Sequence, residues 1–190
     1  MARGGERDSQ RRKLYNAEGV LAVFGDTKLP EVADMVRFTK RVWSYERVRK
    51  AWPLAITRYP FPVVKPGKGR RRAGGDEFGI YMPRHTRDEH ITLHELAHTI
   101  TRREHGNKVA GHGWQYCDIY LRLVLYVLGR EAHNAFKASM KSHRVRFRKP
   151  NKRKLLHPAV TAMRTEQLAR GRATARANRE ARKAALAALG

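Results

Sequence analysis

His94-Glu95-Leu96-Ala97-His98 is the most informative stretch of this chain. Residues four apart on an α-helix lie on one face about one turn apart, so two imidazoles at this spacing can bind one metal ion. The Glu95 carboxylate follows the first imidazole and is placed to exchange protons with a water at such an ion. This H-E-x-x-H arrangement is typical of zinc hydrolases, and it predicts a helix that carries a metal site.

Sequence signals on either side of the motif limit this helix. Thr86 and Glu89 match a capping box, and Asp88 is a second candidate for the N-cap. Gly106 follows the helical pattern and is expected to end the helix. The motif is therefore predicted to lie on a helix that begins near residues 86–88 and ends before Gly106.

The third metal ligand must come from downstream, because a catalytic zinc usually has three protein ligands and one open position. His112 is the strongest candidate, since the glycines on both sides of it allow a tight backbone path toward the helix. His105 lies about 10 Å beyond His98 along the helix axis and can share the ion only if the helix ends earlier. Glu104 is a further alternative.

Apolar periodicity predicts further helices and a small sheet. The expected helices run from Pro30 to the residue before Pro53, from about Trp114 to Leu128 and from about Glu131 to Ser142. The strand candidates are 54–64 and 78–82, and Pro60 and Pro62 restrict the first to a sheet edge. The type of structure of residues 14–24 is left open.

Residues 65–75, between the two strand candidates, are basic and rich in glycine. Two interpretations stay open for this segment: a solvated hairpin connection, or a finger that contacts phosphate groups. Together the expected elements predict an α+β fold. It is helix-rich, with a short antiparallel or mixed sheet and a basic helical C-terminal extension.

Composition divides the 190 residues into three parts. Residues 1–12 are polar and basic and are expected to form a flexible N-terminus. Residues 13–148 hold the motif and most large apolar side chains, and they form the predicted metallohydrolase domain. Residues 149–190 form a basic tail rich in alanine and arginine, and residues 141–190 contain 15 basic and 2 acidic residues.

The chain has 41 Lys and Arg against 17 Asp and Glu, a net charge of +24. This excess favours a polyanionic partner, and DNA or RNA bound through its phosphates is the leading one. Without aromatic residues in the tail, no base stacking is indicated, and a purely solvating tail is the alternative. The residues predicted to contact nucleic acid are Lys65, Lys68, Arg70, Arg71, Arg72, Arg146, Arg148, Lys149, Lys152, Arg153 and Lys154.

The single cysteine, Cys117, allows no intrachain disulfide, which fits a reducing compartment. Its apolar surroundings predict a buried side chain. No apolar run approaches the about 18–20 residues that a membrane span needs, so no membrane association is expected. A cytoplasmic location is predicted.

Three features resemble SprT-like and Spartan-type zinc metalloproteases: the His-Glu-Leu-Ala-His motif, the basic glycine-rich segment before it, and His112-Gly113-Trp114. The chain is even more similar to a small group of HExxH metallohydrolases from actinobacteria and their phages. In that group a segment like Arg7-Asp8-Ser9-Gln10-Arg11 precedes a tyrosine and an Ala-Glu pair, here Tyr15-Asn16-Ala17-Glu18. The resemblance spans about residues 7–148.

The resemblance implies a minimal zincin with the motif on a central helix and a short three-stranded sheet. It makes His94, His98 and His112 the ligands of one Zn²⁺ ion and Glu95 the catalytic acid/base. Spartan-type members cleave proteins crosslinked to DNA, which implies a protein or peptide substrate near nucleic acid. A phage-encoded member would act in the host cytoplasm. The single Cys117 excludes the zinc ribbon that many SprT-like proteins carry.

Two functions from different classes follow from these observations. The first is a zinc-dependent metallohydrolase, specifically a metallopeptidase that acts on proteins near or on nucleic acid. The alternative is a basic nucleic-acid-binding protein with a structural zinc site and no catalysis. A structural zinc has four protein ligands, whereas a catalytic zinc has three and an open position, so the ligand count distinguishes them.

Overall fold

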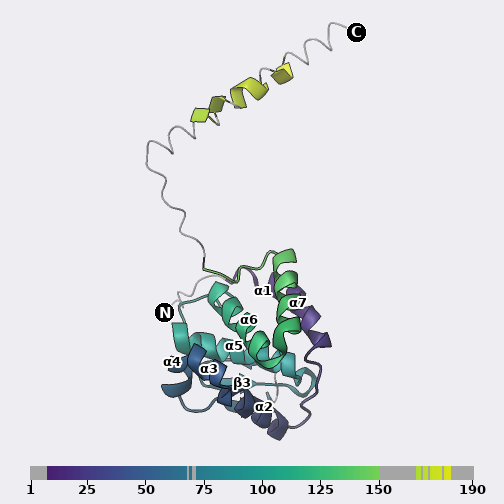
Figure 1. Cartoon of the computed structure of the whole chain (residues 1–190), viewed down its shortest axis with the longest axis vertical. Coiled ribbons are helices and arrows are strands. Elements are labelled where there is room, and N and C mark those ends of the chain that lie inside the picture. Colours follow the sequence, from purple (N-terminus) through teal and green to yellow (C-terminus); the bar gives the residue numbers. More distant parts are fainter. Residues whose placement is uncertain are drawn as a thin grey trace. The chain divides into compact units, whose positions relative to one another are not determined.

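The helix that carries the motif, α5 (Glu89–His105), is the central element of the computed structural model (Figure 1). Asp88 is its N-cap and accepts a hydrogen bond from the Ile91 amide at 2.9 Å. Gly106 ends the helix with φ 71°, a conformation that glycine adopts without strain. The predicted end is therefore confirmed. Of the two predicted starts Asp88 is the correct one, because Thr86 belongs to the preceding 3-10 turn.

The structure describes residues 8–67, 69, 72–149, 166–167, 169–170, 172–176 and 178–180. Contacts between residues divide the chain into two units, Met1–Lys149 and Pro150–Gly190. The predicted boundary after residue 148 lies one residue before this division. In the second unit the described residues are helical, in agreement with the predicted helical extension.

Short strands and helices surround α5 in the first unit. They are α1 (Arg11–Glu18), η1 (Gly19–Val23), α2 (Val32–Ser44), α3 (Glu46–Ala51), α4 (Pro53–Thr57), β1 (Val63–Lys65), β2 (Gly74–Gly75), β3 (Gly79–Tyr81), η2 (Arg84–Thr86), α6 (Trp114–Val127) and α7 (Gly129–Ser142). The predicted α+β, helix-rich class is confirmed. Across the described residues, no helix combines the length and the apolar character needed to cross a membrane.

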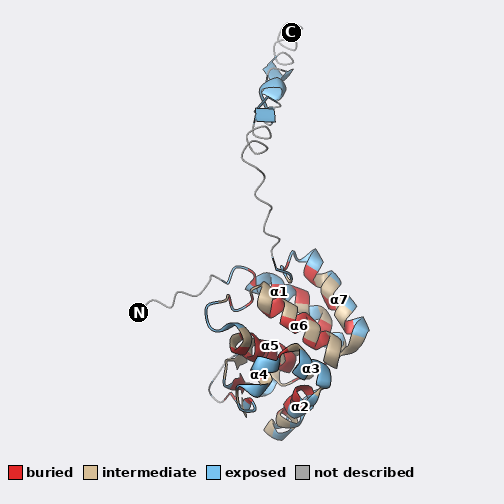
Figure 2. Cartoon of the chain, turned by 60° about the vertical axis from the view of Figure 1, so that its left-hand side comes forward, coloured by how far each residue is buried: buried red, intermediate tan, exposed pale blue. Residues whose placement is uncertain are grey.

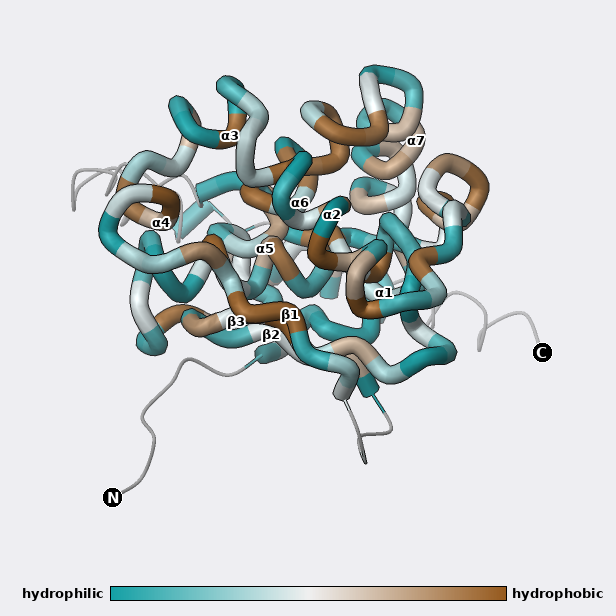
Figure 3. The backbone as a smooth tube through the Cα atoms, turned by 90° about the horizontal axis from the view of Figure 1, so that it is seen from below, coloured by the Kyte–Doolittle hydropathy of each residue, from teal (hydrophilic) through white to brown (hydrophobic). Residues whose placement is uncertain are grey.

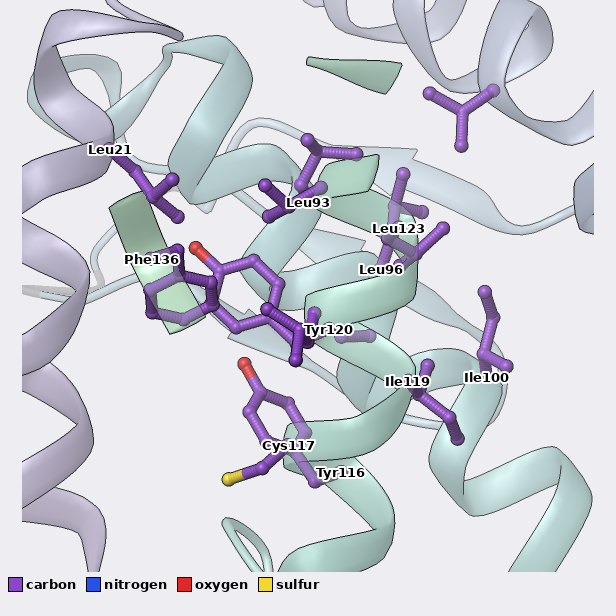
Figure 4. Packing of buried hydrophobic residues seen from close by; sticks show 14 of the residues in the cluster. Leu21, Leu93, Leu96, Ile100, Tyr116, Cys117, Ile119, Tyr120, Leu123 and Phe136 are labelled. Carbon is purple, nitrogen blue, oxygen red and sulfur yellow. The ribbon is translucent and has the colours of Figure 1, made fainter. Parts of the chain in front are cut away.

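Helix α5 lies between the sheet and α6 (Figure 3), and α7 packs against α6 and α1. Buried positions are concentrated on α5 and α6 (Figure 2). The apolar side chains of α5 and α6 that pack in the core include Leu93, Leu96, Ile100, Ile119, Tyr120 and Leu123 (Figure 4). Because this packing leaves α5 buried on several sides, its backbone is a rigid support for the motif.

The sheet has the strand order β1-β3-β2 and is mixed. β1 runs parallel to β3, with Val63 opposite Gly79, whereas β2 runs antiparallel to β3, with Gly75 opposite Ile80. Of the two interpretations of residues 65–75, the hairpin connection is therefore wrong, because parallel strands cannot be joined by a hairpin. Gly74 and Gly75, at the end of this segment, form the edge strand β2.

Glycine is required at position 75 because β2 lies directly against the motif helix. A Cβ atom at position 75 would overlap the backbone carbonyl oxygen of Glu95. At position 79, a Cβ atom would overlap the carbonyl oxygen of Val63 on the neighbouring strand. The two glycines thus allow the sheet to close onto β1 and onto α5 at the motif.

Two of the expected elements upstream of the motif are corrected. The single helix expected before Pro53 is two helices, α2 and α3, because Tyr45 is extended with ψ 126°. Helix α2 begins at Val32, after Pro30. The expected edge strand 54–64 is wrong in its first part, since Pro53 occupies the first turn of the helix α4. Proline is favoured there because its fixed φ suits the helix and its missing N–H is not needed.

Candidate metal centre

Three imidazoles converge at the middle of α5. The ring nitrogens offered by His94, His98 and His112 all lie within 4.8 Å of one another, and His94 and His112 are buried. The Nε2 atoms of His94 and His112 are 3.4 Å apart. Two nitrogen ligands of a tetrahedral zinc, each about 2.0–2.1 Å from the ion, are about 3.3 Å apart. The spacing therefore fits two ligands of one ion.

Each ligand is positioned by a different feature of the local sequence. His94 and His98 are one turn apart on α5, and their ring centroids are 5.1 Å apart. His112 precedes α6, whose N-cap is Gly113, and the Gly113 amide donates to the Ala110 carbonyl at 2.9 Å. This turn brings the ring centroid of His112 to 4.7 Å from that of His98. The His112 ring therefore lies beside the rings of His94 and His98, as the glycines on both sides of His112 predicted.

Carboxylates hold the outer nitrogens of two of these rings. Nδ1 of His94 is 2.7 Å from Oε2 of Glu18, and Nδ1 of His112 is 2.7 Å from Oδ2 of Asp8. A carboxylate accepts a hydrogen bond from Nδ1–H, which leaves the lone pair on Nε2, the nitrogen that faces the other rings. The donor set therefore fits a metal ion in its orientation as well as in its spacing.

Burial and neighbouring charges act on the protonation of the three rings. Burial lowers the pKa of His98 well below its usual value, and the neighbouring His94 and His112 lower it further. Burial also lowers the pKa of His112, although Asp8 opposes the change. Burial also acts to lower the pKa of His94, but the Glu18 and Glu95 carboxylates together outweigh it, so the pKa of that ring is raised. The neutral form, which binds metals, is thus favoured at His98 and His112.

Glu95 is a buried carboxylate beside the first ligand. Its exposed fraction is 6%, and its carboxylate oxygens make no hydrogen bond or ion pair with any residue that the structure describes, whereas its backbone carbonyl accepts from the Thr99 hydroxyl. Burial raises the pKa of Glu95 to about 7, against the opposing effect of His94 and with a contribution from Glu18. Glu95 lines a cavity of about 200 Å³ together with His94, Glu18 and Tyr15. An unpaired carboxylate there can act on a ligand in the cavity.

Two tyrosines of α6 support α5 through hydrogen bonds to its backbone carbonyls. The Tyr116 hydroxyl donates to the His94 carbonyl at 3.1 Å, and the Tyr120 hydroxyl donates to the His90 carbonyl at 3.4 Å. The ring centroid of Tyr116 is also 4.3 Å from that of His98. Both tyrosines are fully buried (Figure 4), so they fix the helix and are not accessible to a substrate.

A second, larger cavity of about 800 Å³ lies beyond His98. Its lining combines the apolar ring of Phe78 with acidic and basic side chains, among them Asp76, Arg102 and Lys108. His98 lines this cavity, and His94 and Glu95 line the smaller one. Open space is therefore present beside His98 and beside His94 and Glu95.

The two alternatives for the third ligand lie away from the cluster. His105 is exposed at the last residue of α5. The Glu104 carboxylate accepts a hydrogen bond from the Ala55 amide at 2.8 Å and so connects α5 to α4. Of the residues that the sequence offered for this role, only His112 joins His94 and His98 within the described ranges.

The residues predicted to contact nucleic acid fall into two groups. Those that the structure describes are all exposed; they are Lys65, Arg72, Arg146, Arg148 and Lys149. The others lie outside the described residues; they are Lys68, Arg70, Arg71, Lys152, Arg153 and Lys154. Arg72 also lines the cavity that contains Glu95, so one predicted phosphate contact lies at the candidate site itself.

Asp8 and Gln10 contact the candidate metal centre, contrary to the expectation that residues 1–12 are flexible. Gln10 is buried, and its side-chain amide donates to the His112 carbonyl at 2.6 Å and to the Arg146 carbonyl at 3.0 Å. Cys117, buried as predicted, packs beside it. Asp8 and Gln10 thus fix the His112 loop from one side. The prediction is wrong for Asp8 and Gln10, because the partners of these two side chains include the buried His112.

Asp8 and Glu18 are expected to control metal affinity without touching the metal. We expect each of the Asp8→Ala and Glu18→Ala variants to bind zinc about 10–100-fold more weakly, because the ring it orients loses its outer hydrogen bond. Competition with a chromophoric zinc chelator measures the affinity. Asp26→Ala and Glu46→Ala, which change exposed carboxylates elsewhere, are the matched controls. Equal affinities in all four variants would contradict the assignment.

Comparisons of the chain with protein-family models, with curated proteins and with solved structures find no match. Any assignment of function therefore depends on the residues and their geometry.

Proposed function

We propose that this protein is a zinc-dependent metallohydrolase, and specifically a metallopeptidase. One observation carries the proposal: three imidazoles from α5 and the loop before α6 converge, with the buried and unpaired Glu95 next to the first of them. Buried charged groups normally have partners, so an unpaired one beside a candidate metal site and a cavity favours a chemical role.

The donor set supports zinc as the metal. Imidazole nitrogens suit zinc, and two of the three rings have the carboxylate partner that is usual for metal-bound histidines. When bound by three protein ligands, zinc keeps a position for water and lowers the pKa of that water to about 7. The described residues supply three ligands, and this count favours a catalytic site over a structural site with four.

In the proposed reaction Glu95 transfers the proton. As the water oxygen bonds to the carbonyl carbon of the substrate, the Glu95 carboxylate accepts a proton from that water. It then delivers this proton to the amide nitrogen as the carbon–nitrogen bond breaks, so the amine leaves neutral. Glu18 lines the same cavity, but its Oε2 is held by His94, so Glu95 is the acidic residue available for this role.

The net charge of +24 supports a substrate that lies near a polyanion such as DNA or RNA. Phosphate contacts from exposed lysines and arginines are independent of base sequence. We therefore include proteins on or near nucleic acid among the substrates of the proposed peptidase.

The test is a joint measurement of metal content and hydrolysis on the full-length protein. Mass spectrometry of the purified protein is expected to find one zinc per chain, and fluorescein-labelled casein is expected to be hydrolysed. A chelator should stop hydrolysis, and added zinc should restore it. Zinc bound at one per chain with no hydrolysis would favour the structural-zinc alternative, and protein that binds no zinc would refute both.

A further inference from the structure

Three tyrosines surround the metal centre, and one of them differs from the other two. Tyr116 and Tyr120 are fully buried, and their hydroxyls donate to carbonyls of α5. Tyr15 is 45% exposed, and its hydroxyl has no hydrogen-bond partner among the residues that the structure describes. Within this set, Tyr15 alone has a donor that a bound molecule can use.

The position of Tyr15 is fixed by the metal centre. It lies on α1 three residues before Glu18, whose carboxylate holds His94. Its ring centroid is 5.7 Å from that of His94 and 5.4 Å from that of His112. Tyr15 also lines the cavity that contains Glu95. A large apolar ring is thus packed against two of the three ligands with its edge in solvent, next to the space where a substrate would react.

We propose that Tyr15 is a catalytic residue that donates a hydrogen bond from its hydroxyl to the carbonyl oxygen of the substrate. The inference rests on the proposed peptidase function and adds a residue to it. As water attacks the carbonyl carbon, negative charge develops on this oxygen, and a fixed donor stabilises it. The proton stays on Tyr15 throughout, so the residue acts without being consumed or regenerated.

Three other side-chain donors line the same cavity, and the structure favours Tyr15 over all of them. The Thr86 hydroxyl is already engaged, because it donates to the Pro83 carbonyl at 2.9 Å. His90 has its Nδ1 atom 3.1 Å from the Gly25 carbonyl oxygen, so one of its ring nitrogens is engaged. Arg72 is an exposed residue of the segment between β1 and β2. None of these three side chains has a ring contact with a candidate ligand among the described residues, whereas Tyr15 contacts two. Tyr15 therefore has the more fixed position relative to the reacting atoms.

The Tyr15→Phe variant removes the hydroxyl and keeps the ring contacts. In the zinc-loaded full chain we expect kcat for labelled casein to fall about 100-fold, at the lower end of the effect of losing one oxyanion donor. KM and zinc affinity are expected to stay within twofold of the wild-type values. A phosphinic peptide, which carries a tetrahedral anionic group, is expected to bind Tyr15→Phe more weakly by a similar factor, as measured by calorimetry.

Matched variants separate the possible outcomes. Tyr126→Phe removes a tyrosine hydroxyl on α6 that has no contact with the ligands, and it is expected to keep wild-type activity. Unchanged kcat and inhibitor binding in Tyr15→Phe would overturn the inference, and a loss in Arg72→Ala instead would assign the donor to Arg72. Zinc-loaded wild-type protein without hydrolysis would overturn the proposed function and this inference with it, whereas an active Tyr15→Phe variant overturns the inference alone.

Discussion

The Glu95→Gln variant is expected to keep its zinc and to lose about 10²–10⁴-fold in hydrolysis, the usual contribution of general acid–base catalysis. Glutamine has nearly the shape of glutamate but cannot accept the proton of the attacking water at neutral pH. Because the Glu95 side chain has no partner among the described residues, the substitution breaks no hydrogen bond or ion pair there. Zinc content by mass spectrometry and turnover of labelled casein should be measured on the same preparation.

Glu89→Gln is the matched control for this experiment. Glu89 lies on the same helix, but its carboxylate pairs with Arg41 at 2.7 Å, and the two side chains are 14% and 53% exposed. The amide oxygen of glutamine can still accept the hydrogen bond from Arg41, so this variant is expected to fold and to hydrolyse casein as the wild type does. Wild-type turnover in Glu95→Gln would refute the proposed role. Loss of zinc from Glu95→Gln would instead make Glu95 a fourth ligand and would favour a structural site.

Local sequence signals predicted the centre of the site. The spacing of His94 and His98 depends only on helix geometry, and the end of α5 at Gly106 depends on one residue that adopts positive φ. The glycines beside His112 predicted its close approach to the motif, and there the reason is space rather than positive φ: Gly113 has φ −62°, but a Cβ atom on it would lie 3.2 Å from the Ala110 carbonyl oxygen. Each of these signals lies within a few residues of the feature that it predicts.

The outer carboxylates had no comparable signal. Asp8 and His112 are 104 positions apart in sequence, and Glu18 and His94 are 76 apart. No periodicity connects pairs at such distances, and only the folded arrangement of α1 against the rest of the unit brings them together. The segments that carry the family resemblance contain Asp8, Tyr15 and Glu18, but the resemblance implies no role for these three residues. Their positions around the three imidazoles suggest such a role.

The edge strand β2 was missed for a different reason. Glycine has low β-propensity, so Gly74-Gly75 predicts a loop when it is considered alone. In the fold, a side chain at position 75 would overlap the Glu95 carbonyl, and this packing requirement outweighs propensity. Similarly, Pro53 predicted only an end to the preceding helix, although it also begins the short helix α4.

The His112→Ala variant is expected to bind zinc more than 100-fold more weakly than the wild type. Removing a ligand costs more than removing an outer partner, for which about 10–100-fold is usual. The loss of zinc affinity can be measured without a substrate, because a zinc ion that binds only the folded state stabilises that state. At a zinc concentration of 100 times the wild-type Kd, the wild type gains about 2.7 kcal/mol. The same concentration gives His112→Ala at most about 0.4 kcal/mol.

His105→Ala is the control, because His105 was the alternative third ligand and is exposed at the end of α5. Zinc should raise the Tm of this variant as much as that of the wild type, and chelator should reverse both shifts. A zinc-dependent rise in Tm that persists in His112→Ala and vanishes in His105→Ala would identify His105, at the end of the helix, as the third zinc ligand. That result requires α5 to unwind before Gly106, since His105 lies almost two turns beyond His98 in the helix seen here.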